Sequence, residues 1–227
     1  MVIFKDITEE ARAASAIIRS RIGDFSTLEE AIPRAISEEV KFYFMTRHSR
    51  FCEDIRLYPK SDIDHLDISP STRHYSISFN NGSTKDVKLL GAVRIIIGSP
   101  LPILSNFHDM SFEPGKLFAE ISRFAVRKKS STEPYKELGC PSYVIYAGLI
   151  NLLDELSSKY GIDFLFGEFL DQDFLSLIKR WVPGTEELGK AFITDKGVRD
   201  ITSVYGLKID VKTARKIGGK IKKFLMV

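Results

Sequence analysis

Two charged residues interrupt an apolar stretch of strand length, L-F-A-E-I-S-R-F-A-V, at residues 117–126. Burying an unpaired charge costs much free energy, so Glu120 and Arg123 indicate either an ion pair inside a sheet or a site that carries out chemistry. Their spacing would place them on opposite faces of a regular strand. A β-bulge between them would turn both towards one site, and bulges are common beside active sites.

Three further charged features could pair with these two residues. Arg94 interrupts a second apolar run, K-L-L-G-A-V-R-I-I-I, and Arg47 falls on an expected helix. A loop carries three neighbouring carboxylates, which repel one another unless cations lie close by; they are Asp62, Asp64 and Asp67. Mutually paired ionisable groups are typical of a binding or catalytic cleft. The alternatives are structural ion pairs and a polar surface loop.

Hydrophobic periodicity and turn signals predict helices and strands that would position these groups. Helices are expected at residues 7–21, shortly after 27, at 37–55, at 141–161 and from about 171 to 181. Strands are expected at 74–79, 88–97, 117–126 and 162–170, with shorter strands at 191–194 and 207–211. This order predicts an α+β (α/β) fold with a mixed sheet, and one domain is the simplest account.

Composition places the chain among ordinary globular proteins, because 44% of its residues are hydrophobic and 28% are charged. No apolar run is long enough to span a bilayer. The first residues are acidic where a signal peptide would be basic and then apolar, so export is not expected. Two distant cysteines fit a reducing, cytoplasmic location. The four histidines form no ligand pattern, so no metal is expected.

Basic residues are concentrated at the C-terminal end. From Lys208 onwards, seven basic residues face Asp210 alone, so this tail carries +6 and the rest of the chain −3 of the total +3. Such a tail favours an acidic partner. Nucleic acid is not expected, since no aromatic–basic interleaving or binding motif accompanies the charge. A solvated helix face is the alternative.

Four short motifs occur in a fixed order along the chain: Arg47-x-x-x-Phe51, Asp64-x-x-Asp67, Gly91-x-x-Arg94 and Glu120-x-Ser122-Arg123-Phe-Ala-Val. Together they resemble the autoinducer synthase family, which makes acyl-homoserine lactones, and the related N-acyl amino acid synthases and exosortase-associated acyltransferases. The resemblance covers roughly residues 40–180. It implies a GNAT-like mixed, mostly antiparallel central sheet flanked by helices, in an acyltransferase domain at 37–227. Residues 1–36 lie outside the resemblance, and their helical pattern predicts an N-terminal helical extension.

Two departures favour one branch of this group. Autoinducer synthases carry a tryptophan shortly after the phenylalanine, where this chain has Leu57; its single tryptophan is Trp181. This difference puts recognition of S-adenosylmethionine in doubt. The run R-I-I-I-G-S-P-L-P-I at residues 94–103 looks closer to the N-acyl amino acid and exosortase-associated branch. We therefore expect an N-acyltransferase that moves a medium or long acyl chain to the amine of an amino acid or related small molecule.

The resemblance also implies residue roles. It assigns catalysis to Glu120 as general base, with Ser122 and Arg123 beside it. It assigns acceptor binding to five residues: Arg47, Phe51, Asp64, Asp67 and Arg94. It assigns the acyl donor to the segment that follows, where backbone N–H groups would polarise the thioester carbonyl; the segment comprises Phe124, Ala125, Val126, Arg127 and Lys128. The thioester would lie where the strands at 117–126 and 162–170 part, with its phosphopantetheine arm near the helix that starts at Pro141.

The donor is expected to be acyl carrier protein, with acyl-CoA as the alternative. Carrier proteins are acidic, and the basic tail and Arg127-Lys128-Lys129 offer docking charges. Coenzyme A would need a glycine-rich phosphate loop, whereas the connection at 127–139 has Gly139 alone, which also disfavours a short-chain acetyltransferase. Two alternatives stay open: an acyl-homoserine lactone synthase, and a non-catalytic acyl- or ligand-binding protein on the same fold. Neither the acceptor nor the chain length can be read from the sequence.

Overall fold

The computed structural model describes residues 2–21, 24, 28–51, 63–80, 87–98, 100–108, 110, 112–126, 141–169, 172–194 and 201–216. The chain divides into two compact units. Unit 1 comprises residues 1–96 and 122–148, and unit 2 comprises residues 97–121 and 149–227. Within the described residues, no helix is long and apolar enough to cross a membrane.

The strands of unit 1 pair in an antiparallel manner. β1 (Val2–Asp6) pairs with β2 (Thr72–Asn80), β2 pairs with β3 (Val87–Ile97), and β3 also pairs with the short β5 (Ala125–Val126). The two longer strands confirm the predictions at 74–79 and 88–97. β1 was not predicted, because an apolar run this short shows no hydrophobic periodicity.

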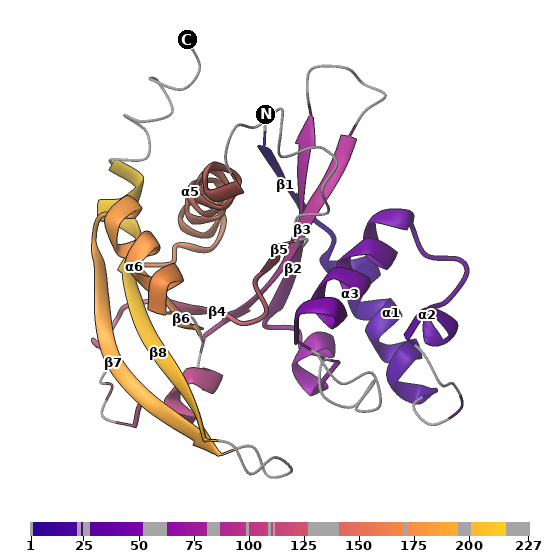
Figure 1. Cartoon of the computed structure of the whole chain (residues 1–227), viewed down its shortest axis with the longest axis horizontal. Helices are drawn as coiled ribbons and strands as arrows, with labels where there is room; N and C mark the ends of the chain where they lie inside the picture. The colour runs from indigo at the N-terminus through magenta and orange to yellow at the C-terminus, as the bar shows by residue number, and fades with distance from the viewer. Residues whose placement is uncertain are drawn as a thin grey trace. The chain divides into compact units, whose positions relative to one another are not determined.

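Three helices of unit 1 group beside β2 and β3 in Figure 1: α1 (Thr8–Ser20), α2 (Leu28–Ala31) and α3 (Glu38–Phe51). All three were predicted. α1 buries Ala11, Ala14 and Ile18, which recur at helical spacing. Ile17 is exposed, since it lies to one side of that stripe. Val40 and Phe44 of α3 join the α1 residues in one apolar core.

The first 36 residues are not purely helical. β1 pairs with β2 along its whole length, and Arg12 of α1 donates to the backbone carbonyl of Thr72 at 3.1 Å. The N-terminal segment thus contributes a strand as well as helices to unit 1. The division of the chain into an extension at 1–36 and a domain at 37–227 stays a prediction.

The stretch at 117–126 does not form one strand, so that prediction is wrong. β4 (Phe118–Ile121) ends before Ser122, and β5 starts at Ala125. Between them Arg123 has a φ of 109°, a left-handed conformation that is strained for a residue with a side chain. The Ser122 N–H donates to the Arg94 carbonyl at 2.8 Å. The break therefore anchors Ser122 to β3 and gives Arg123 a backbone direction that no regular strand offers.

Unit 2 contains a mixed set of strands in the order β4–β6–β8–β7. β6 (Phe164–Phe169) runs parallel to β4 and antiparallel to β8 (Ile201–Asp210), which pairs with the antiparallel β7 (Thr185–Thr194). A parallel pair needs a long crossover connection, which includes α5 (Pro141–Tyr160). α6 (Gln172–Trp181) follows β6, and residues 211–216 form a helix after β8.

These elements confirm the predicted mixed, mostly antiparallel arrangement, since β4–β6 is the one parallel pair that the described residues show. β7 and β8 are longer than the strands expected at 191–194 and 207–211. Glycines interrupt their apolar pattern. Gly206 of β8 has a physical reason to be glycine: a Cβ atom there would lie 2.7 Å from the Phe107 ring.

Candidate functional site

A buried ion pair joins α3 to the aspartate loop in unit 1. Arg47 donates from Nη1 to Asp67 Oδ1 at 2.7 Å and from Nη2 to Asp67 Oδ2 at 3.3 Å. Both side chains have no exposed surface. This fork-on-fork arrangement fixes the two planar groups relative to each other. The helical spacing of α3 places Arg47 one turn beyond Tyr43, whose hydroxyl accepts a second bond from Nη1 at 2.9 Å.

A second guanidinium, that of Arg94 on β3, extends the pair into a network. Arg94 donates from Nη1 to Asp64 Oδ1 at 2.7 Å and from Nη2 to Asp64 Oδ2 at 3.1 Å. Its Nη1 also lies 3.1 Å from Asp67 Oδ1. The Ser122 hydroxyl accepts from Nη2 at 2.8 Å. Each aspartate therefore holds one arginine by both oxygens, and Arg94 bridges the two carboxylates.

The two aspartates are positioned by the short 3₁₀ helix η2 (His65–Ile68). Asp64 is its N-cap and accepts the Leu66 N–H at 2.8 Å, while Asp67 Oδ2 accepts the Asp64 N–H at 2.9 Å. This reciprocal capping box is the reason for the Asp-x-x-Asp spacing. The same oxygens that accept the capping N–H groups also accept from arginine: Asp64 Oδ1 from Arg94 and Asp67 Oδ2 from Arg47.

Arg123 forms the outer edge of the network. Its Nη2 lies 3.9 Å from Asp64 Oδ2, and the two side chains are 28% and 27% exposed. The inner members are sealed: Arg47, Asp67 and Arg94 are at most 1% exposed. A small molecule from solvent can therefore reach the carboxylate of Asp64 and the guanidinium of Arg123, but none of the inner groups.

The electrostatics of the network keep its members charged. Burial by itself would raise the pKa of Asp67, but the Arg47 and Arg94 guanidinium groups outweigh it and hold that pKa well below its usual range. Burial by itself would lower the pKa of Arg94, but the carboxylates of Asp67 and Asp64 outweigh it and raise that pKa above its usual value. Removing one partner of such a buried pair leaves an uncompensated charge, which costs about 3–5 kcal/mol.

Sequence reasoning missed two members, Tyr43 and His74. The Tyr43 hydroxyl lies 2.7 Å from His74 Nδ1, and His74 Nε2 lies 3.0 Å from the Asp67 carbonyl oxygen. Burial raises the pKa of Tyr43 and lowers that of His74 to about 4, so both side chains are neutral near pH 7. The pairing of His74 with Arg94 across β2 and β3 was the available signal, but it needs the strand register, which the sequence does not supply.

Glu120, the expected base, belongs to unit 2. It is 4% exposed, and its Oε2 accepts the Ile103 N–H at 2.7 Å. Ile103 is part of the 3₁₀ helix η3 (Pro102–Ser105). Glu120 pairs with Phe166 of β6, and a second carboxylate, Glu168, lies two residues further along that strand. Both oxygens of Glu168 accept from Asn106 Nδ2, at 2.9 and 3.1 Å. The two glutamates thus hold η3 and the residue after it.

The remaining predicted residues are only partly described. Phe124 is half-buried and Ala125 is buried in β5. The side chains of Phe51 and Val126 lie outside the described residues, as do Arg127 and Lys128 entirely. The structure therefore brings six of the predicted residues together in one network: Arg47, Asp64, Asp67, Arg94, Ser122 and Arg123. Among the described residues, no group of three or more His, Cys, Asp or Glu side chains could hold a metal ion.

No family model and no curated protein matches the sequence. Among solved structures, the chain is similar to LasI, an acyl-homoserine lactone synthase, with a TM-score of 0.54 and 14% identity over 96% of this chain and 93% of that chain. It is also similar to FeeM, an N-acyl amino acid synthase from uncultured soil microbes, with a TM-score of 0.46 and 18% identity over 94% of this chain and 98% of that chain. A spermidine N-acetyltransferase from Vibrio cholerae in complex with CoA and spermine gives a TM-score of 0.43 and 11% identity, covering 94% and 97%.

The likeness to LasI shows the fold of this chain. The GNAT-like α+β fold predicted from the four motifs is confirmed.

Proposed function

We propose that the chain is an N-acyltransferase that moves a medium or long acyl chain from a thioester donor to the amine of an amino acid or a related small molecule. The fold that it shares with an acyl-homoserine lactone synthase supports this class of activity. The order of the four motifs supports the same class. The lack of a tryptophan shortly after Phe51, where the chain has Leu57, favours amino acid acceptors over lactone synthesis.

The observation that carries the proposal is the pair of groups at the edge of the buried network. Asp64 and Arg123 are each about one quarter exposed and lie 3.9 Å apart. A free amino acid carries an ammonium and a carboxylate one carbon apart. In our proposal Asp64 accepts hydrogen bonds from the ammonium, and Arg123 donates to the carboxylate. The sealed inner ion pairs hold Asp64 in place and do not touch the acceptor.

The proposed reaction needs a base, because an ammonium cannot attack. Glu120 is our candidate to take the proton, directly or through a water molecule. The neutral amine then attacks the thioester carbonyl, the N–C bond forms and the C–S bond breaks. The nitrogen gives up its surplus proton and the sulfur takes one up, so the products are an amide and a thiol. The backbone N–H groups of Phe124–Val126 are the candidates to stabilise the negative charge on the carbonyl oxygen. The Ile103 N–H donates to Oε2 of Glu120 and holds this carboxylate in place.

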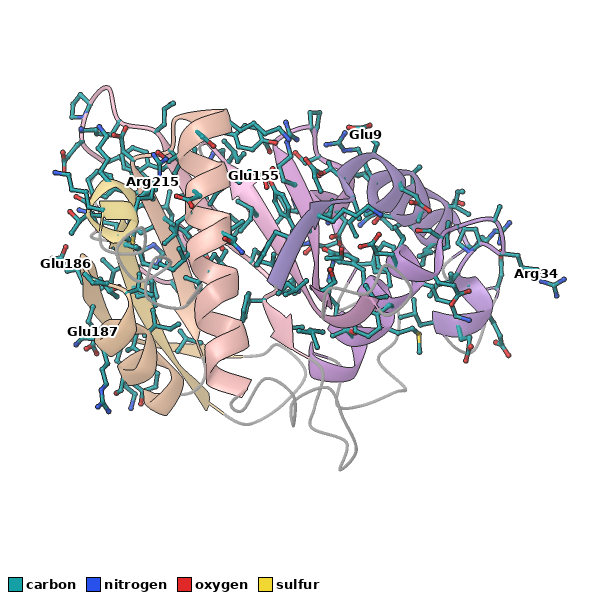
Figure 2. The ribbon with its side chains drawn as sticks, turned by 90° about the horizontal axis from the view of Figure 1, so that it is seen from above. Glu9, Arg34, Glu155, Glu186, Glu187 and Arg215 are labelled. Carbon is teal, nitrogen blue, oxygen red and sulfur yellow. The ribbon has the colours of Figure 1, made fainter. Side chains whose placement is uncertain are left out.

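Acyl carrier protein is the proposed donor, and the basic tail is its proposed docking surface. Several tail cations already bind within unit 2. Lys212 lies 3.0 Å from Asp163, and Arg215, labelled in Figure 2, donates to Asp154 at 3.1 Å and to Ser157 at 2.7 Å. These pairs reduce the charge that is available to a partner. Lys216 is exposed, and it is the described tail residue that we assign to docking.

The function is tested by incubating the purified protein with matched acyl carrier protein and acyl-CoA donors. The acceptors are the twenty amino acids, S-adenosylmethionine and spermidine in separate reactions, with products identified by mass spectrometry. N-acyl amino acids support the proposal. Acyl-homoserine lactone from S-adenosylmethionine would favour the lactone synthase alternative. No product with any pair, although acyl donor binds, would favour the non-catalytic binding protein.

A further inference from the structure

A closed ring of hydrogen bonds surrounds the inner ion pair of unit 1. It runs from Arg47 to the Tyr43 hydroxyl, from there to His74, and from His74 to the Asp67 backbone carbonyl. Asp67 closes the ring, because its side chain binds Arg47. The four residues come from α3, β2 and η2, and all four side chains are buried.

The direction of each bond follows from the chemistry of its ends. The Asp67 carbonyl oxygen only accepts, so His74 Nε2 carries a proton and donates to it at 3.0 Å. The neutral ring then has a bare Nδ1, which accepts from the Tyr43 hydroxyl at 2.7 Å. That hydroxyl in turn accepts from Arg47 Nη1. A single histidine tautomer, the one protonated at Nε2, gives a donor and an acceptor to each of these three bonds.

Protonation of His74 would break the ring. Nδ1 would become a donor and the Tyr43 hydroxyl would lose its acceptor. The charged groups that face the imidazole are Arg47 from α3, Arg94 from β3 and Asp67 from η2, and the neutral polar neighbour is Thr8, whose Oγ1 accepts the His74 backbone N–H at 3.0 Å. A positive charge on His74 would be the third beside the two guanidinium groups and one carboxylate, so the net repulsion disfavours the charged imidazole.

The ring reaches Asp64, the exposed carboxylate, through η2. His74 fixes the carbonyl of Asp67, and the Asp67 side chain accepts the Asp64 N–H at 2.9 Å. Asp64 in turn accepts the Leu66 N–H. A shift of the Asp67 backbone therefore moves the capping box and the Asp64 carboxylate with it.

We propose that His74, held by Tyr43, is a positioning residue: it locks η2 onto α3 and β2 and thereby sets the place of the Asp64 carboxylate that receives the acceptor amine. This inference rests on the proposed function for its catalytic consequence, but its structural consequence can be measured without any activity. His74 does not touch the acceptor, because it is buried behind Asp67.

The structural test uses nuclear magnetic resonance on the full chain with ¹⁵N-labelled histidine. Wild-type His74 is expected as the neutral Nε2–H tautomer at pH 7. Amide hydrogen exchange of Asp64 and Leu66 should speed up about tenfold or more in His74→Leu, because the capping box loosens. His74→Gln keeps a donor and an acceptor and should stay within about threefold of wild type. His65→Gln is the matched control, since His65 lies exposed on the same short helix.

An Nδ1–H or charged His74 at pH 7, or unchanged Asp64 and Leu66 exchange in His74→Leu, would overturn the proposal. If His74→Leu does not fold, Tyr43→Phe carries the same comparison, because it removes the hydroxyl and keeps the ring. Equal exchange in Tyr43→Phe and wild type would then overturn it.

The catalytic test separates the two substrates. In His74→Leu or Tyr43→Phe, the KM for the amino acid that wild type acylates should rise about tenfold, the effect of one lost hydrogen bond to a charged group. The KM for the acyl donor should stay within twofold, and His74→Gln should rescue most of the loss. Equal losses for both substrates, or no rescue, would contradict the positioning role. No acylation by wild type would refute the proposed function, while the exchange experiment still decides the role of His74.

Discussion

Acidification should destabilise the fold, because the unfolded chain takes up a proton at His74 at a higher pH than the folded chain does. An unfolded histidine takes up a proton near pH 6.5, whereas His74 in the fold does so only near pH 4, because burial lowers its pKa. Between these values the unfolded chain binds more protons, so the free energy of unfolding falls as the pH falls. Each tenfold difference in proton affinity is worth about 1.4 kcal/mol, so the loss from this residue reaches about 3 kcal/mol by pH 4.

Urea unfolding between pH 7.5 and 4 measures this loss. The pH dependence of unfolding sums over the whole chain, so the expected result is a difference between variants. His74→Gln should lack about 3 kcal/mol of the wild-type pH dependence, and His65→Gln should keep all of it. Below about pH 4 a further loss is expected, because the pKa of Asp67 is lowered in the fold, so the unfolded chain takes up a proton there at a higher pH than the folded chain does. Identical slopes for wild type and His74→Gln between pH 6.5 and 4.5 would refute the assignment of a buried neutral imidazole.

Three substitutions test other parts of the structure. Arg94→Ala leaves Asp64 and Asp67 without their shared cation and should destabilise the fold by about 3–5 kcal/mol; a melting temperature within a degree of wild type in a thermal scan would contradict the buried network. Glu120→Gln should keep the fold and slow acyl transfer about 100-fold or more, and wild-type turnover by the folded variant would remove Glu120 from the mechanism. Gly206→Ala should cost about 1–3 kcal/mol through overpacking against the Phe107 ring, which denaturant unfolding would detect; an unchanged midpoint would show that the ring moves aside freely.

The sequence predicted those elements of the fold that have a clear period. α1, α3, α5 and β2 follow from helical or alternating spacing of apolar residues, and β3 follows from a nearly continuous apolar run. β1 was missed because it is too short to show a period, and β7 and β8 were predicted too short because glycines interrupt them. The stretch at 117–126 misled the prediction for a different reason. Its aromatic and β-branched residues favour a strand, but the bonds of Ser122 to Arg94 in the tertiary structure outweigh that local preference.

The candidate site was predictable where motifs carried it. Asp64, Asp67 and Arg94 stand in recognisable spacings, and the structure places them in one network. The burial of that network could not be predicted, because the exposure of its side chains depends on how η2 packs against α1 and β2. His74 and Tyr43 carry no motif, since their roles arise from the β2–β3 register and one turn of α3.

Acceptor discrimination tests the central claim most directly: that Asp64 and Arg123 recognise the ammonium and the carboxylate of an amino acid. The measurement is kcat/KM for an amino acid and for its methyl ester, in wild type, Asp64→Asn and Arg123→Gln. Asp24→Asn and Arg34→Gln are controls, since both side chains are exposed and Figure 2 labels Arg34.

Wild type and controls should prefer the free acid by about tenfold or more. Arg123→Gln should lose this preference, and Asp64→Asn should lower kcat/KM for both acceptors alike. Equal use of acid and ester by wild type, or an unchanged preference in Arg123→Gln, would contradict the account.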